Sequence, residues 1–179
     1  MDRSLVNRVG LLAIAAIFLI TVALSNLLLS GFRTDLTDNR LYTLSEGTVN
    51  ILESISETVN LYFFFSDRAA ADNSYLRNYA QRVREILAEF EEYAGTNLRV
   101  TVVDPLSFSE DEDRATAFGL RGISLGLTTD QVFLGIAGTN AIGDEEVIAF
   151  LDPNKETLLE YELARLIYSL ASPSKPTIG

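Results

Sequence analysis

The sequence contains no cysteine and no histidine, and only two of its 179 residues are lysine, Lys155 and Lys175. Without cysteine there are no disulfide bonds, no thiolate nucleophile and no CxxC redox pair. Without histidine the chain lacks the commonest acid–base group at neutral pH, and with it Ser-His-Asp triads and HExxH zinc sites. These absences point away from most enzymes, and we expect no catalytic, cofactor-binding or metal-binding residues.

Basic residues are also scarce. The net charge is −11, whereas binding to DNA or RNA needs clusters of Lys and Arg that neutralise phosphates. Nucleic acid is therefore excluded as a partner.

One long stretch, residues 9–32, contains no charged side chain. As a helix its 24 residues would span about 36 Å, enough for a hydrocarbon core of about 30 Å. The alternative is a cleaved signal peptide, with Arg3 and Arg8 in its charged region and cleavage near residues 23–25. Because the apolar run continues through residues 27–29, the pattern favours an uncleaved transmembrane helix that anchors the chain in a lipid bilayer.

Flanking charges predict the orientation of this helix. Arg3 and Arg8 precede it, whereas Asp35 and Asp38 soon follow it. The positive-inside rule then keeps residues 1–8 in the cytoplasm and places the remainder across the membrane. We expect a single-pass protein of the bacterial inner membrane, with its main domain periplasmic or extracellular. That domain has a net charge of −12, from 12 basic and 24 acidic residues, so it should not adsorb to anionic lipids.

The remaining pattern predicts an α/β domain. Residues 33–57 form a membrane-proximal linker with an amphipathic helix, which begins at a capping box of Thr43 and Glu46. The pattern of residues 58–171 predicts a strand (59–65), a long helix (72–94) and a second strand parallel to the first (98–103). A short helix (110–120), an antiparallel hairpin (131–138 with 146–151) and a final helix (156–171) follow. This order is that of a thioredoxin-like β-α-β/β-hairpin-α domain, here without redox cysteines. Residues 172–179 have the composition of a linker to a second domain, which we expect to be missing or absent from this chain.

Two further patterns have a structural and a functional interpretation. The acidic run Glu110–Asp113 could bind a hard cation, but acids are also favoured at the start of a helix, and the run lacks the spacing of a calcium loop. The glycines at 119, 122 and 126 fit no phosphate-binding motif and suit turns in an exposed loop, residues 119–130. Glycosidase chemistry would need two inward-facing acids across a cleft, whereas the acid clusters here are typical of exposed surface.

Two stretches carry a family likeness. Residues 35–37 and 40–48, directly after the apolar run, resemble the start of the GldG-type (gliding-motility-associated) ABC-transporter auxiliary proteins. Residues 160–163 with 175–179 are similar to the end of that family's first extracytoplasmic domain. The resemblance implies a non-enzymatic, membrane-anchored partner of an ABC permease subunit and, through it, of a cytoplasmic ATPase.

The resemblance also indicates where a partner would dock. The candidate docking residues are Arg40, Tyr42, Thr43, Ser45, Glu46, Glu160, Tyr161 and Glu162. An arginine and a tyrosine just outside a bilayer suit the membrane interface. Three alternatives remain open: the junction is a simple connector held by domain packing, residues 160–162 are a solvated helix face with a tyrosine lying across the sheet edge, or the protein is a stand-alone anchored sensor or scaffold without a transporter.

Overall fold

The structure is a computed structural model, and it describes residues 44–124 and 131–172 together with Phe18. The chain divides by its internal contacts into residues 1–41 and 42–179, and the fold below is that of the second unit. Among the described residues, no helix is both long and apolar enough to cross a membrane. The predicted span, the candidates Arg40, Tyr42 and Thr43, and the linker from residue 173 onward lie outside the described residues, Phe18 excepted.

A mixed α/β domain with one sheet and four described helices forms the second unit. The helices are α2 (Glu46–Glu53), α3 (Ser74–Ala94), α4 (Glu110–Ala117) and α5 (Leu159–Ala171). The strands are β1 (Val59–Phe65), β2 (Leu98–Val103), β3 (Gly122–Ser124), β4 (Gln131–Thr139) and β5 (Glu145–Ile148). Short 3-10 turns, η1 (Gly95–Asn97) and η2 (Pro153–Leu158), precede β2 and α5.

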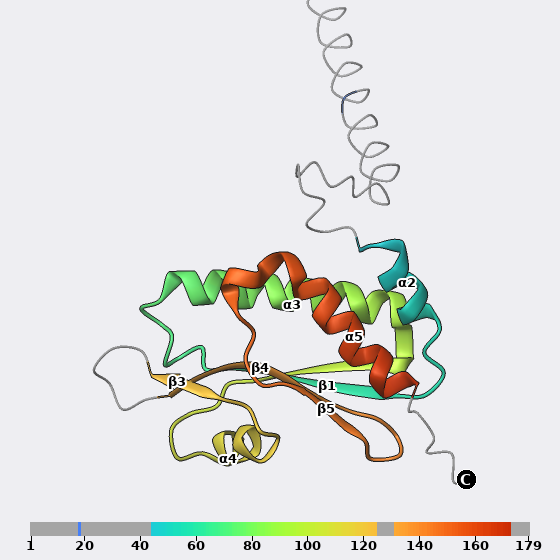
Figure 1. Cartoon of the computed structure of the whole chain (residues 1–179). Coiled ribbons are helices and arrows are strands. Elements are labelled where there is room, and N and C mark those ends of the chain that lie inside the picture. Colours follow the sequence, from blue (N-terminus) through green and yellow to red (C-terminus); the bar gives the residue numbers. More distant parts are fainter. Residues whose placement is uncertain (1–17, 19–43, 125–130, 173–179) are drawn as a thin grey trace, which may run out of the picture. The chain divides into compact units, whose positions relative to one another are not determined.

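The strands follow the order β2-β1-β4, with β2 at an edge of the sheet, and both β3 and β5 pair with β4 (Figure 1). β1 and β2 are parallel and are connected by α3, as predicted from the strand–helix–strand pattern. Asn73 caps α3 by accepting a hydrogen bond from the Leu76 backbone N–H, and Gly95 ends it with a φ of +60°. β4 is antiparallel to both β1 and β5, which confirms the predicted hairpin.

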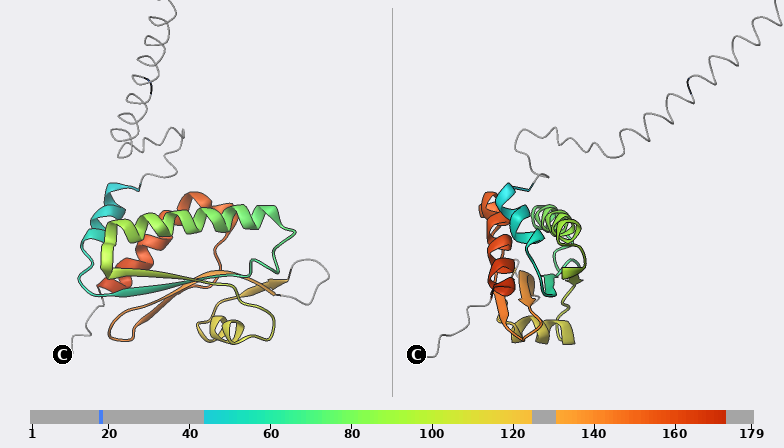
Figure 2. Two further views of the ribbon diagram at one scale, coloured as in Figure 1. Left: turned by 180° about the vertical axis from the view of Figure 1, so that it is seen from behind. Right: turned by 90° about the vertical axis from the view of Figure 1, so that its right-hand side faces the viewer.

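Helices cover both faces of the sheet. α2, α3 and α5 lie on one face and the short α4 lies on the other (Figures 1 and 2). β1 contributes to both sides, because Phe63 and Phe65 belong to the main core and Phe64 belongs to the smaller cluster around Ala115. A strand buried on both faces reads as a continuous apolar run, as β1 does.

The turn between β4 and β5 is tied to the end of α5. The side chain of Asn140, which is 7% exposed, donates hydrogen bonds to the Leu170 carbonyl and to Asp144 Oδ2. Its own oxygen accepts from the backbone N–H groups of Ile142 and Asp144. This Asx-type turn fixes the hairpin against the helix that covers it.

Several details of the predicted elements are wrong; among them, β5 ends at Ile148 and not at residue 151, and α4 ends at Ala117 and not at residue 120. The first described helix is capped by Ser45, whose hydroxyl accepts from the Thr48 backbone N–H, and not by Thr43. Part of the predicted loop over residues 119–130 is strand β3, because its backbone pairs with the start of β4. The last helix begins at Leu159, after a 3-10 turn that Asp152 caps and Pro153 opens.

Candidate functional site

An open groove of about 500 Å³ lies between α2 and α5. Its walls come from both helices and from the 3-10 turn before α5: Ser45, Gly47, Thr48, Ile51, Thr157, Glu160, Tyr161, Ala164, Arg165 and Tyr168. Ligand-binding clefts in proteins are typically of this size and largely apolar. The groove is therefore the strongest candidate for a binding surface in the part of the chain that the structure describes.

Small residues leave room for this groove where the two helices meet. α2 buries Leu52 against the core, and α5 buries its apolar face. Between them, Gly47 has no side chain and no atom within 4 Å of the position where its Cβ would lie. Ala164 is buried and provides only a methyl group. The helices thus touch through their larger apolar residues and remain apart at the groove.

Glu160 joins the two walls of the groove. Its Oε1 accepts a hydrogen bond from the Ser45 backbone N–H at 2.8 Å and another from the Thr48 hydroxyl at 2.6 Å. Ser45 Oγ and Thr48 Oγ1 are themselves 3.0 Å apart. One carboxylate on α5 therefore satisfies two donors at the N-terminus of α2, where the helix dipole also favours negative charge.

These contacts set the charge state of Glu160. Burial alone would raise the pKa of its carboxyl group, but the hydrogen bonds from the Thr48 hydroxyl and from Ser45 outweigh that effect and lower the pKa. The side chain is consequently ionised at neutral pH and holds α2 against α5 in that state.

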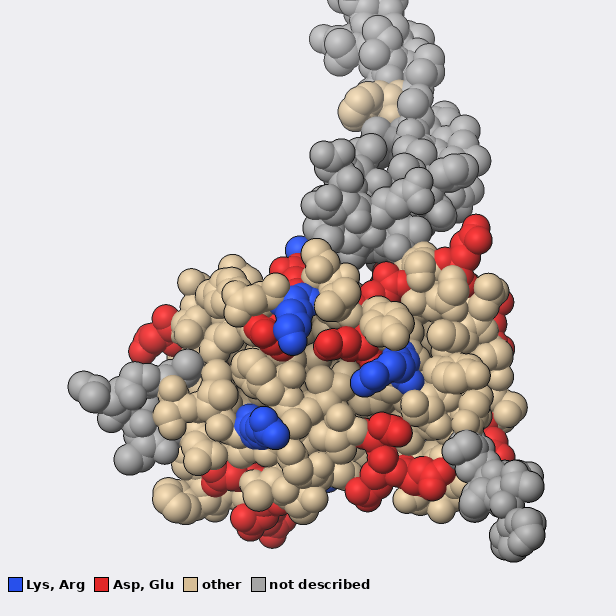
Figure 3. Space-filling model, viewed as in Figure 1, with Lys and Arg blue, Asp and Glu red and all other residues tan. Residues whose placement is uncertain are grey.

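A stripe of large side chains follows the outer rim of the groove. Tyr161, Arg165 and Tyr168 are spaced by four and three residues, so they lie on one face of α5. The two tyrosines are 65% and 55% exposed. Figure 3 views this side of the molecule, where much of the surface is uncharged and basic and acidic groups are scattered. Exposed Tyr and Arg beside an apolar cleft are the residues that most often dominate protein–protein binding energy.

The structure brings together some of the predicted docking residues and not others. Ser45 and Glu160, which are 115 positions apart, are in direct contact, and Tyr161 lines the same groove. Glu46 and Glu162 lie outside the groove lining. Gly47 and Thr48 also line the groove and lie within the stretch 40–48 that carries the family likeness, whereas sequence reasoning did not indicate Ile51, Thr157, Ala164, Arg165 and Tyr168 as lining residues. The position of Tyr168, seven residues after Tyr161, was a signal that could have identified it.

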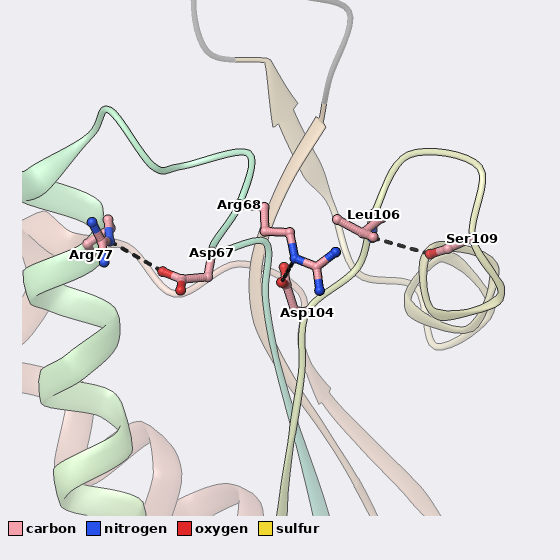
Figure 4. Close-up of polar contacts among 6 residues, drawn as sticks. All are labelled: Asp67, Arg68, Arg77, Asp104, Leu106 and Ser109. Carbon is pink, nitrogen blue, oxygen red and sulfur yellow. Dashed lines mark hydrogen bonds and ion pairs between the residues drawn. The ribbon is translucent and has the colours of Figure 1, made fainter.

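A second polar cluster lies where β1 and β2 end (Figure 4). Asp67 pairs with Arg77 and Arg68 pairs with Asp104, each at 3.3 Å. These two ion pairs fix the loop after β1 to α3 on one side and to the end of β2 on the other. Each drawn charge has a partner of opposite sign, and the cluster contains no nucleophile with an adjacent base, so it offers no catalytic arrangement.

The acidic run Glu110–Asp113 forms the first turn of α4, after the N-cap Ser109. The structure therefore supports the interpretation that these acids mark a helix start. Among the described residues, no group of three or more acidic side chains is placed to hold a metal ion.

Comparison with protein-family models identifies the family of this chain. A family model described as a domain of unknown function (DUF7088) matches residues 38–139. The chain belongs to the DUF7088 family. No curated protein and no solved structure matches the chain. In this DUF7088 member the matched segment contains α2 and Ser45 but ends before α5 and Glu160, so the groove is built from both the matched and the unmatched parts.

Replacing Glu160 of this DUF7088 chain with glutamine should lower the free energy of unfolding at pH 7 by about 1–2 kcal/mol, since the uncharged amide oxygen that replaces the carboxylate accepts the same hydrogen bonds more weakly. The folded-state pKa of Glu160 is lowered, so its contribution is complete above the ordinary glutamate pKa and disappears as the pH falls through the folded-state value. Urea unfolding of both proteins should therefore give a difference that shrinks on acidification.

Glu162→Gln is the matched control, because Glu162 is two residues away on the same helix and does not line the groove. The control should change the stability by less than about 0.5 kcal/mol. Equal effects of the two substitutions, or a Glu160 effect that does not vary with pH, would contradict the proposed role of the carboxylate.

Proposed function

We propose that this protein is a non-enzymatic, membrane-anchored auxiliary subunit of an ABC transport system. Its domain, on the periplasmic or extracellular side of the bacterial inner membrane, would dock on the permease subunit through the α2–α5 groove. The permease in turn would connect it to a cytoplasmic ATPase. The uncharged run of residues 9–32 would hold the protein in the bilayer.

The groove is the observation that carries this proposal. The two stretches that resemble the GldG-type auxiliary proteins, residues 40–48 and 160–163, are far apart in sequence, yet Ser45 and Glu160 are hydrogen-bonded at one surface. A surface assembled from both stretches is a natural site for the function that the resemblance implies. Arg40, Tyr42 and Thr43, which lie outside the described residues, precede this surface directly in the chain.

We also propose that the domain is thioredoxin-like. The parallel β1–α3–β2 unit, the antiparallel β4–β5 hairpin and the closing helix α5 follow that arrangement, with β1 and β4 adjacent in the sheet. The sequence contains no cysteine, so such a domain has no thiol with which to perform redox chemistry. A protein-binding role is consistent with a fold that retains the scaffold without its reactive groups.

The test is co-purification of the full chain with an ATPase and a permease in detergent. Tyr161→Ala combined with Tyr168→Ala should weaken this association at least about 30-fold, as truncation of buried aromatic anchors does. Tyr75→Ala with Tyr93→Ala is the matched control, because these α3 tyrosines are also exposed, at 58% and 43%, and neither lines the groove. The control should bind like the original protein.

Two results would count against the proposal. If no ATP-hydrolysing partner is present at stoichiometric level, the stand-alone sensor or scaffold is favoured. If the partner is present but the two double variants bind equally well, the transport assignment survives and the groove is not the docking surface.

A further inference from the structure

Phe108 is the most exposed large apolar side chain among the described residues. Its relative exposure is 101%, and it lies in the loop between β2 and α4. Its φ is +64°, the only positive φ of a non-glycine residue in the part of the chain that is described. The left-handed region is unfavourable for a residue with a Cβ, and full exposure leaves an apolar ring in water. Both features cost free energy in the isolated domain.

The backbone around Phe108 is held in place. Ser109 Oγ accepts hydrogen bonds from the backbone N–H groups of Leu106 and Glu112, at 3.2 and 3.3 Å, and Figure 4 shows the first of them. The Phe108 backbone N–H donates to the Glu112 carboxylate. A residue directly before an N-cap often packs on the fourth residue of the helix, but that residue here is the charged Asp113. The ring is therefore displayed on a fixed loop without an apolar partner from α4.

Apolar surface continues beside Phe108. Val102 and Leu106 are 50% and 37% exposed, and both line a surface depression of about 410 Å³ that also includes Arg68 and Asp104. Val102 lies in the edge strand β2, and in the same strand the backbone N–H of Val100 donates a hydrogen bond to the Glu91 carboxylate. The surface thus combines a projecting ring with a shallow recess, which suits a partner of complementary shape.

Charge identifies the kind of partner. Four consecutive acids, Glu110–Asp113, come after Phe108 and the N-cap Ser109, and three of them are exposed. Anionic lipid would be repelled by these side chains, and a single aromatic ring provides too little apolar area to hold a protein on a membrane. A second copy of the chain would bring the same acids and a net charge of −11 against them. A protein surface with basic residues has the complementary charge.

We propose that Phe108 is the anchor of a second interaction surface, and that it inserts into an apolar pocket of a partner protein whose rim carries Lys or Arg side chains. α4 and the α2–α5 pair lie on opposite faces of the sheet (Figure 1). The domain can therefore hold this partner while the groove is occupied, and the inference does not depend on the transport function proposed above.

The test places the photo-crosslinking amino acid p-benzoylphenylalanine at position 108 of the full chain, in cells that naturally express it. The control site is position 142, because Ile142 is 66% exposed in the β4–β5 turn. We expect a protein adduct that forms from position 108 and not from position 142. The adduct should map to an apolar segment flanked by Lys or Arg, and it should be lost when Glu110→Lys and Asp111→Lys are combined in the same chain.

The partner identified by this adduct then allows a binding measurement. Phe108→Ser should weaken binding about 30-fold, and Ile142→Ser should leave it unchanged. Circular dichroism should give the same spectrum for both variants, because each residue is exposed. An adduct to lipid, to a second copy of the chain or to an acidic segment would overturn the proposal. Equal adducts from both positions, or none from position 108, would do so as well.

Discussion

Phe63→Ala should lower the free energy of unfolding by about 3–5 kcal/mol, whereas Phe108→Ala should change it by less than about 0.5 kcal/mol. Phe63 is completely buried in the main core, where its ring stacks on Phe65 with centroids 6.4 Å apart. The Arg84 guanidinium lies over both rings. Removing the Phe63 ring leaves a cavity and takes away the surface on which these groups pack, and the loss is a large share of the stability of a typical domain.

Equilibrium urea unfolding of the full chain, followed by circular dichroism, measures both variants on one scale. The comparison is informative because the substitution is the same and only the burial differs. If Phe108→Ala proved as destabilising as Phe63→Ala, the ring at position 108 would be part of the core. The proposal that it is reserved for a partner would then lose its basis.

Much of the element order could be predicted from the sequence, because local patterns determine it. The apolar spacing of α3, together with Asn73 before it and Gly95 after it, defines a helix that ends at Ala94 as expected and begins at Ser74, two residues after the expected start. The antiparallel pairing of β4 and β5 likewise follows from two apolar runs joined by a polar turn. In these cases the residues that specify the structure lie within the element or directly beside it.

The elements that were missed depend on distant contacts. β3 has only three residues and no apolar run, and it is a strand because its backbone pairs with Gln131–Phe133. Ser45 caps α2 with its own hydroxyl, and its backbone N–H also donates to Glu160 of the neighbouring helix α5. A sequence pattern gives no information on which of several capping residues will meet a carboxylate 115 positions away.

The candidate groove also combines residues that could be predicted from local sequence with packing that depends on distant contacts. Ser45, Glu160 and Tyr161 could be selected from the sequence one by one, but nothing in the sequence indicated that they line one surface. The groove requires the packing of α2 on α5, which depends on buried residues such as Leu52 and Leu163. It also requires small residues, Gly47 and Ala164, at the point where the helices remain apart. Residues that shape a surface by being small carry no chemical signal of their own.

Gly135→Ala should destabilise the protein by about 1–3 kcal/mol, although alanine has the higher intrinsic propensity for a strand. A Cβ at position 135 would lie 2.7 Å from the Ile148 carbonyl oxygen and 2.9 Å from Leu120 Cδ2. The Ile148 oxygen is a backbone atom, so it cannot rotate away from the new Cβ. The clash can be relieved only if β4 and the chain at the end of β5 move apart. Because Gly135 also pairs with Phe64 of β1, such a shift disturbs the centre of the sheet, and thermal or urea unfolding should show the loss directly.

Gly47→Ala is the matched control and should have the opposite sign. Gly47 lies inside α2, and nothing is within 4 Å of the position that its Cβ would take. Alanine there lowers the backbone entropy of the unfolded chain and should stabilise the protein by about 0.5–1 kcal/mol. If both substitutions stabilised the protein, the close approach of β5 to Gly135 would be wrong. If both destabilised it, the free space at the groove would be wrong, and the surface between α2 and α5 would be closed to a partner.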